Sequence, residues 1–302
     1  MKFKKYDDVK AFYNDTFEVL MRHEAQNMIQ LGNILIGYRG EDKAGWRDPA
    51  NWLMATVSDE TGIRLTAIMT PPHNISLHAT DNIICDEALQ CLADGLLAGP
   101  QPPDAQAALP VPGVIAEKAL AERFARIFAA ASGTGYRVTM DQRIYELTKV
   151  NPDIRIIGKI RKAREQDLAF LPYWIEAFMT RSPDAPAPVQ PDIGLYSRYV
   201  TNGKLFVLEY EGTPVSIAGI NRELPNVCAV ASVYTPPYFR NKGFATSCVA
   251  QLSQRMLDKG FSKCSLYTNL ANPTSNSIYQ KIGYTPICDS LEIKFAFPDN
   301  GV

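Results

Sequence analysis

Residues 230–252 read VASVYTPPYFRNKGFATSCVAQL, and residues 264–284 read CSLYTNLANPTSNSIYQKIGY. The first stretch opens with an apolar, β-branched run that ends at Thr235-Pro236-Pro237, and a helical pattern begins a few residues later. A strand, a short loop and a helix in this order leave free backbone N–H groups at the helix start, where the helix dipole is positive. The segment therefore predicts a site for an anion.

Four residues of the loop and first helical turn support this interpretation. Gly243 and Ala245 have little or no side chain, so a phosphate can approach the backbone closely. Arg240 and Lys242 add positive charge beside them. The pattern predicts a pyrophosphate site, although it has the spacing of neither a P-loop nor a dinucleotide fingerprint.

The loop motif resembles the acyl-CoA-binding core of the GNAT acetyltransferase superfamily. After its fourth strand, that family carries Arg or Gln, then Gly three residues later, then Gly or Ala two residues after that. Arg240, Gly243 and Ala245 match these three positions. The residues that follow give this short motif its specificity.

The second stretch matches the other half of the family pattern. There the family shows a fifth strand and an Asn, followed seven residues later by a Tyr ahead of a Gly-aromatic pair. Asn272, Tyr279 and Gly283-Tyr284 occupy these positions. The resemblance covers about residues 153–297 and implies one mixed sheet flanked by helices, with acetyl-CoA as the cofactor.

Length and element order predict two domains. A chain of 302 residues is long enough for two hydrophobic cores. We expect an acetyl-CoA-binding GNAT catalytic domain over 151–302. Residues 1–150 suggest the same order of elements, which predicts a degenerate GNAT-like domain that binds no cofactor, packs on the second half and shapes the acceptor cleft. The expected fold class is α/β (α+β), with tandem GNAT-like mixed sheets flanked by helices.

Hydrophobic periodicity and turn residues place the expected elements. In the second half we expect strands over 154–161, 205–210, 215–221, 227–235, 263–268 and 287–295, and helices over 165–179, 242–259 and 273–282. In the first half we expect helices over 8–22, 24–35, 83–97 and 117–131, and strands over 52–58, 63–69, 74–79, 114–116 and 136–150. Proline-rich segments predict loops at 99–112 and 181–191, and a short helix is expected at 195–199.

The first half lacks the features of the anion site. At the equivalent position it reads Ala79-Thr80-Asp81-Asn82, with no glycine, no arginine and a carboxylate that repels phosphate. We therefore expect CoA to bind in the second half alone.

Composition argues against several classes of protein. Lys and Arg number 31 against 32 Asp and Glu, a net charge of −1, so no nucleic-acid partner is expected. No run approaches the ~20 apolar residues of a membrane span, and the N-terminus MKFKKYDDVKAFY lacks the uninterrupted apolar run of a signal peptide. We expect no membrane partner and a cytoplasmic location. The six cysteines and three histidines lack metal-ligand spacing, so no metal is predicted.

The family resemblance implies where the cofactor binds. Backbone groups at the strand end would pair with the pantetheine arm, a backbone N–H there would polarise the thioester oxygen, and the loop and helix amides would hold the pyrophosphate. The Asn of the second motif would hydrogen-bond the pantetheine arm. The expected cofactor-binding residues are Val233, Tyr234, Thr235, Arg240, Asn241, Lys242, Gly243, Phe244, Ala245, Thr246, Asn272 and Ser275.

Tyr279 matches the family's usual general acid, which protonates the leaving thiolate, and is the expected catalytic residue. Three of the expected residues also have structural interpretations. Asn272 can be a helix N-cap, because Asn-Pro is a favoured helix start. Ser275 can be an exposed serine of the first turn, and Tyr279 can be a core tyrosine.

The sequence leaves the general base open. Some members of the family place a glutamate five residues before the Asn, where this chain has Tyr267. Glu223 and Glu176 are alternatives, and each can equally be a solvated surface residue. A water chain that needs no single base is a further possibility.

The sequence as a whole predicts an acetyl-CoA-dependent N-acetyltransferase, an acyltransferase that acts on a primary amine of a small molecule or peptide. The amine would attack directly in a ternary complex. The alternative is a non-catalytic acyl-CoA-binding or sensor module, as expected if the acceptor cleft were blocked. The sequence specifies neither the acceptor nor the oligomeric state.

Overall fold

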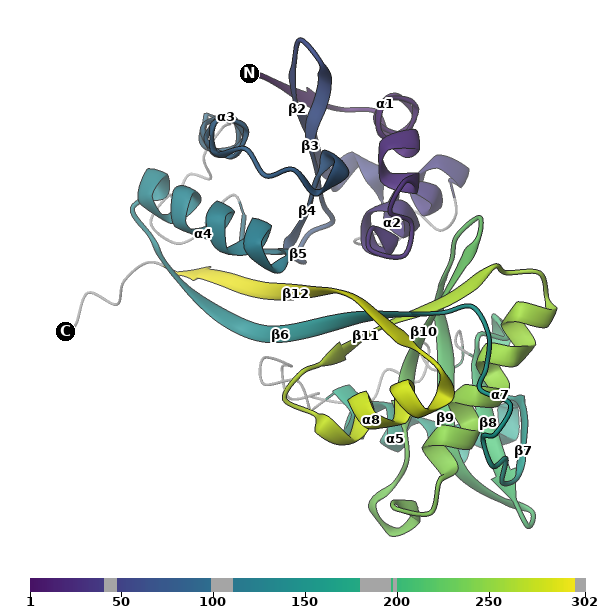
Figure 1. Ribbon diagram of the computed structural model, residues 1–302. Helices are drawn as coiled ribbons and strands as arrows, with labels where there is room; N and C mark the ends of the chain where they lie inside the picture. The colour runs from purple at the N-terminus through teal and green to yellow at the C-terminus, as the bar shows by residue number, and fades with distance from the viewer. Residues whose placement is uncertain (41–47, 99–110, 180–196, 198–199, 297–302) are drawn as a thin grey trace. The chain divides into compact units, whose positions relative to one another are not determined.

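The computed structural model describes residues 1–40, 48–98, 111–179, 197 and 200–296. The chain divides into two compact units (Figure 1). Unit 1 comprises Met1–Arg143 and Cys288–Val302, and unit 2 comprises Ile144–Ile287. This division differs from the single boundary near residue 150 that the sequence suggests, because the end of the chain belongs to unit 1.

Unit 1 is a mixed sheet flanked by helices, with strands in the order β1-β2-β3-β4-β5-β12-β6. Its β4 and β5 are parallel, whereas β1, β2, β3 and β4 pair antiparallel in succession. The elements are β1 (Lys2–Tyr6), α1 (Val9–Met21), α2 (Met28–Arg39), β2 (Leu53–Asp59), β3 (Gly62–Met69), β4 (Ile75–Ala79), α3 (Asp86–Leu97), β5 (Gly113–Glu117), α4 (Lys118–Ser132) and β6 (Gly135–Leu147).

Unit 2 has the same architecture, with strands in the order β12-β6-β11-β10-β9-β8-β7. Here β10 and β11 are the parallel pair, and β7 to β10 pair antiparallel in succession. The elements are β7 (Lys159–Lys162), α5 (Leu171–Met179), β8 (Leu205–Tyr210), β9 (Thr213–Glu223), β10 (Val227–Tyr234), α7 (Phe244–Asp258), β11 (Lys263–Asn269) and α8 (Pro273–Ile282). The strand β12 (Thr285–Ala296) begins in unit 2 and continues from Cys288 in unit 1.

The units repeat one order of elements and exchange their last strands. In unit 1, β5 pairs antiparallel with β12, and Ser290 lies opposite Glu117. In unit 2, β11 lies next to β6, and the Ser265 hydroxyl donates to the Tyr145 carbonyl at 2.7 Å. Each closing strand therefore completes the sheet of the other repeat, and no single cut in the chain separates the units.

Each unit has its own hydrophobic core. In unit 1, Leu92 of α3 and Phe124 of α4 pack on the sheet. In unit 2, α7 and α8 cover one face of the sheet, with Val230 of β10 beneath them. The other face lies under α5, where Trp174 packs near Tyr234. We call these the α7 face and the α5 face.

The parallel strands of unit 2 separate before they end. Pairing runs from Val227 opposite Lys263 to Ala229 opposite Ser265 and stops there. Beyond this point β10 has an irregular register with β9, and Ser232 has a φ of 52°. Because a β-bulge bends its strand, the end of β10 diverges from β11. Within the described residues, its backbone groups on that side have no β11 partner.

Most of the expected elements are confirmed to within a few residues, and β8 and α8 match at both ends. Three differences stand out. β1 has no counterpart among the expected strands, β7 begins only at Lys159, and a 3₁₀ turn over Glu165–Ala169 precedes α5. The expected loops at 99–112 and 181–191 and the short helix at 195–199 fall largely outside the described residues.

Across the described part of the chain, no helix has both the length and the apolar character needed to cross a membrane.

Candidate functional site

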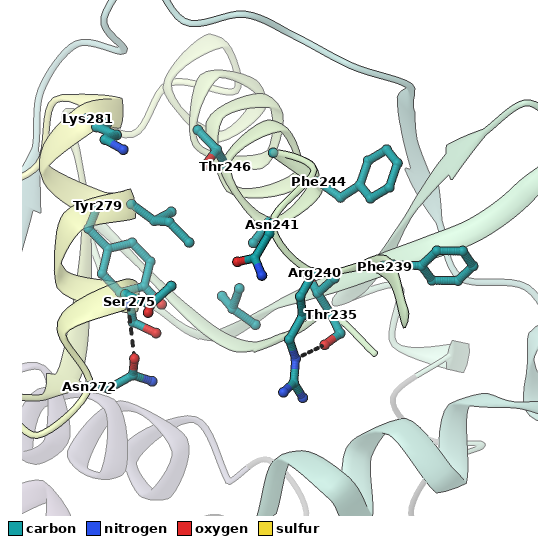
Figure 2. Close-up of a pocket in the computed structure, with 15 residues that line it drawn as sticks. Thr235, Phe239, Arg240, Asn241, Phe244, Thr246, Asn272, Ser275, Tyr279 and Lys281 are labelled. Atoms are coloured by element: carbon teal, nitrogen blue, oxygen red, sulfur yellow. Dashed lines mark hydrogen bonds between the residues drawn. The ribbon is translucent and has the colours of Figure 1, made fainter. Parts of the chain in front are cut away.

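Unit 2 contains a cavity of about 480 Å³ at the start of α7 (Figure 2). The end of β10, the loop before α7, the first turn of α7 and one side of α8 line it. The lining includes these expected site residues: Val233, Thr235, Arg240, Asn241, Gly243, Phe244, Ala245, Thr246, Asn272, Ser275 and Tyr279. Lys242 and Tyr234 are not among the lining residues.

The start of α7 presents backbone donors to this cavity. Gly243 is the N-cap residue, and no side chain caps the helix end. The first helical bond runs from the Ser247 amide to the Gly243 carbonyl at 3.0 Å. The amides of residues 244–246 therefore have no partner within the helix. They offer N–H groups at the positive end of the helix dipole, as the sequence predicts.

The loop before α7 depends on left-handed backbone conformations. Gly243 has a φ of 81°, and Asn241 has a φ of 62°. A Cβ built at Gly243 lies 3.4 Å from Ile157 Cδ1, which is close but not a severe clash. Glycine is therefore needed at this position chiefly for its backbone conformation.

Arg240 ties the loop to the end of β10. Its Nε donates to the Thr235 carbonyl at 3.1 Å (Figure 2). The guanidinium thus braces the strand end beside the cavity. Lys242, by contrast, is exposed.

Tyr234 differs from its two neighbours on β10. Side chains alternate along a strand, so Val233 and Thr235 line the cavity while the Tyr234 ring packs near Trp174 on the α5 face. The Tyr234 carbonyl accepts a hydrogen bond from the Ser216 hydroxyl at 3.1 Å. The side chain of Tyr234 is therefore a core group, and the expected role of this residue toward the cofactor is one for its backbone.

The start of α8 confirms the N-cap interpretation of Asn272. Its Oδ1 accepts a hydrogen bond from the Ser275 amide at 3.1 Å, and Pro273 occupies the first helical position. Within the described residues the Nδ2 group of Asn272 makes no hydrogen bond. Capping therefore leaves the amide donors of this side chain facing the cavity region.

Tyr279 combines a core ring with a cavity-lining position. The residue is 7% exposed, and its ring lies 6.0 Å from the Tyr284 ring and 6.3 Å from the Tyr145 ring. Burial raises the pKa of Tyr279 to about 12. No described residue hydrogen-bonds its hydroxyl. Figure 2 shows Tyr279 and Ser275 extending from the same side of α8.

Four lining residues have no role in the sequence-based prediction: Phe239, Thr274, Ile278 and Lys281. Three of them lie on α8, where the spacing of 274, 278 and 281 follows the helical period of Ser275 and Tyr279. Helical periodicity therefore predicts that Thr274, Ile278 and Lys281 lie on the same side of α8 as Ser275 and Tyr279. Phe239 belongs to a short 3₁₀ turn, for which the sequence has no comparable signal.

Neither glutamate considered as a general base, Glu223 or Glu176, lines the cavity. Glu223 pairs with Lys259 at 2.7 Å and Lys204 at 3.3 Å. Burial raises the pKa of Glu223, but the hydrogen bond and charges of the two lysines outweigh burial and lower it. A carboxylate held in this way is a poor base. Glu176 lies on α5, and Tyr267, which stands where some family members have a glutamate, lies on β11, so the cavity identifies no base.

The equivalent position of unit 1 is built differently. Asp81 and Asn82 both have left-handed backbone conformations, with φ of 53° and 59°. The Arg22 guanidinium contacts both Asp81 carboxylate oxygens, at 3.2 and 3.1 Å. The first turn of α3 carries Asp86 and Glu87. In unit 1, carboxylates of Asp81, Asp86 and Glu87 therefore lie at the position that is equivalent to the free amides of unit 2.

The cavity, the uncapped helix and the divergent strands of unit 2 occur within a recognisable family pattern. Residues 169–284 match the model of the acetyltransferase (GNAT) family. This part of the chain is a GNAT domain. The match spans β8 to α8 and so includes every lining residue of the cavity.

Solved structures resemble this chain over almost its whole length. A protein from Drosophila has a TM-score of 0.62 at 12% identity, covering 97% of this chain and 98% of its own. A GCN5-related N-acetyltransferase from Sphaerobacter thermophilus has a TM-score of 0.60 at 12% identity, covering 99% and 98%. A GNAT-family acetyltransferase from Colwellia psychrerythraea has a TM-score of 0.53 at 13% identity, covering 99% and 100%. At such identities the likeness establishes the fold.

A search of curated proteins finds no significant match to the sequence.

Proposed function

We propose that this protein is an acetyl-CoA-dependent N-acetyltransferase that acts on a primary amine of a small molecule or peptide, by direct attack in a ternary complex. The observation that carries the proposal is one cavity that combines an uncapped helix N-terminus, an unpaired strand end and a tyrosine hydroxyl. Acetyl-CoA supplies a thioester whose C–S bond breaks as the amine forms a C–N bond, while a proton passes from the amine to the thiol.

The start of α7 fits a pyrophosphate. The amides of residues 244–246 would donate to its oxygens, and the helix dipole favours negative charge there. Ala245 and Thr246 line the cavity without a carboxylate nearby among its lining residues. Arg240 adds a positive charge at the same edge, while its Nε holds the strand end.

The end of β10 fits the extended arm of the same ligand. After Ala229 this strand has no β11 partner, so its backbone groups can pair with an amide-bearing chain as a further strand would. The Asn272 Nδ2 group is a second donor on the opposite side of the cavity. The Ser216 hydroxyl fixes the Tyr234 carbonyl of β10, and the Ser275 amide fixes the Asn272 side chain. Neither contact involves the ligand.

Tyr279 fits the role of a hydrogen-bond donor to the departing sulfur. A pKa raised to about 12 keeps its phenol protonated throughout the physiological range. Complete transfer of that proton to a thiolate with an ordinary pKa of ~8.5 would cost about 5 kcal/mol. The structure-based role is therefore a hydrogen-bond donor that stabilises developing charge on sulfur, with solvent completing the proton transfer.

The differences between the units support one active site per chain. In unit 1 the left-handed loop residues are clamped by Arg22 and Gln26, and the helix start carries two carboxylates. A phosphate there would meet negative charge. Unit 1 therefore binds no CoA, and the stoichiometry of CoA binding to the full chain is one.

The alternative is a sensor that binds acetyl-CoA without turnover. Tyr279 favours an enzyme, because pyrophosphate binding alone requires no phenol at that position. Incubation of the full chain with acetyl-CoA and a panel of primary amines, with thiol release as the readout, tests the proposal. Amine-dependent release supports the enzyme, whereas tight CoA binding without release for any amine supports the sensor.

A further inference from the structure

A single arginine marks the point where the two parallel strands of unit 2 separate. Arg222, near the end of β9, is the lateral partner of Ala229, and Ala229 is the last residue of β10 that pairs with β11. The register shifts between Ala229 and Val230, and Asn221 is the extra residue on β9. Such a bulge re-aims the side chain beside it. Arg222, Ala229 and Ser265 thus form the last complete row before the strands diverge.

This row places Arg222 on the α5 face of the sheet. Cys228 and Val230, on either side of Ala229, both belong to the core of the α7 face. Because successive side chains alternate, Ala229 and its partner Arg222 face the other way. Glu223, the next residue, points to the α7 face, where it accepts from Lys259 of α7.

The Arg222 guanidinium has no counter-ion among the described residues. Its Nε is buried and donates no hydrogen bond. Burial lowers the pKa of Arg222, and the neighbouring ionisable group that acts on it is Tyr267, two residues beyond Ser265 on β11. A buried N–H donor that has no acceptor costs free energy. The position therefore favours an anion that arrives from outside the chain.

The separation of β10 from β11 connects this anion with the proposed acetyl transfer. The cavity with the cofactor-binding features lies at the far end of the diverging part of β10, four residues or about 13 Å along the strand from Ala229. The pyrophosphate and the pantetheine arm of acetyl-CoA would lie on the α7 face. The second substrate of the proposed reaction would approach from the α5 face, where Arg222 and Tyr267 lie beside the point at which the two strands separate.

We propose that Arg222 binds a carboxylate of the acceptor, so that the substrates are small amines that carry a carboxylate, such as amino acids. A guanidinium presents two parallel N–H donors that match a carboxylate, which gives orientation as well as affinity. The inference rests on the proposed acetyl transfer. It adds the chemical class of the acceptor to it.

The test compares matched acceptors with the wild-type chain. Glycine, β-alanine and γ-aminobutyrate are each paired with the corresponding amide, and kcat/KM is measured by thiol release. A charged hydrogen bond of ordinary strength predicts a preference for the carboxylate of roughly 10- to 100-fold in at least one pair. In Arg222→Gln this ratio should fall by the same factor, and intrinsic differences in amine reactivity cancel when the wild-type ratio is divided by the variant ratio.

Two controls assign the effect to Arg222. Arg255→Gln removes a guanidinium that lies over the Phe206 ring on the α7 face, and it should leave the ratio unchanged. Arg222→Lys keeps the charge without the paired donors and should retain an intermediate ratio. The Kd for CoA should be the same in all four proteins, because these arginines lie outside the CoA cavity.

The outcomes separate this inference from the proposed function. Turnover of amines with no preference for carboxylates in any pair would overturn the role of Arg222 and leave acetyl transfer intact. If no amine is turned over, thermal shifts with CoA present give a readout independent of activity. Protection by an amino carboxylate but not by its amide, lost in Arg222→Gln, supports the site; equal shifts with both ligands overturn it. The wild-type comparison also decides the question if the variant does not fold.

Discussion

The substitution Ala245→Asp should leave the stability of the fold unchanged or raise it, while it weakens the binding of CoA. Ala245 lies in the first turn of α7 and lines the cavity. A carboxylate there interacts favourably with the positive helix end, by about 0.3–1 kcal/mol, so the melting temperature should not fall. The same carboxylate would occupy the place of the pyrophosphate.

The expected loss of affinity follows from Coulomb's law. Two unit charges 4 Å apart repel by about 4 kcal/mol at an effective dielectric constant of 20, and screening in a half-open cavity lowers this to about 2 kcal/mol. The Kd for CoA should therefore rise by roughly 30- to 1000-fold. Ala245→Asn is the matched control, since it has the same shape without the charge.

Isothermal titration calorimetry of CoA into the three proteins measures this effect, together with the stoichiometry. The difference between Asp and Asn should shrink as salt is added. Equal affinities for the Asp and Asn variants, both folded, would refute the placement of the pyrophosphate at α7. A stoichiometry of two per chain would refute the account of unit 1.

Four further predictions address the other parts of the site and the fold. Tyr279→Phe should lower kcat by roughly 10²- to 10⁴-fold with little change in the Kd for CoA; normal turnover would return Tyr279 to the core. Since burial raises the pKa of Tyr279 to about 12, its proton is lost only near that pH, and kcat should show no decline caused by Tyr279 below pH ~10. Asn272→Ser should keep the helix cap yet weaken acetyl-CoA binding about 2- to 12-fold, whereas Asn272→Ala should also cost about 1 kcal/mol of stability; identical binding in wild type and Ser would remove the amide from the site. A fragment of residues 151–302 lacks the β6 residues that lie beside β11, so it should be poorly soluble or inactive, and a stable, fully active monomer would contradict the strand exchange.

The sequence predicts the core of unit 2 well because its signals there are local. The Pro-Pro pair after β10, the glycine before α7 and the Asn-Pro start of α8 each fix a boundary through backbone chemistry. The ends of α8 and β8 accordingly match in full. The cavity gathers most of the expected residues for the same reason, since they lie at the ends of these elements.

The features that the sequence misses depend on contacts between distant segments. Whether β5 pairs with β6 or with β12 is decided by packing across the sheet, and nothing local to 135–147 or 285–296 indicates an exchange. The orientation of the Tyr234 side chain is a smaller example: its backbone remains an expected partner of the cofactor, while strand alternation and Trp174 place its ring in the core. The isolation of Arg222 also becomes visible only when the strands are paired.

The most direct test of the central claim is a single assay of thiol release from acetyl-CoA by the wild-type chain and by Tyr279→Phe, with and without primary amines. We expect amine-dependent release by the wild type and a loss of roughly 10²-fold or more in the variant, while both proteins bind one CoA per chain with similar affinity. Binding of CoA by both proteins without amine-dependent release by either would contradict it and identify the protein as an acyl-CoA-binding module.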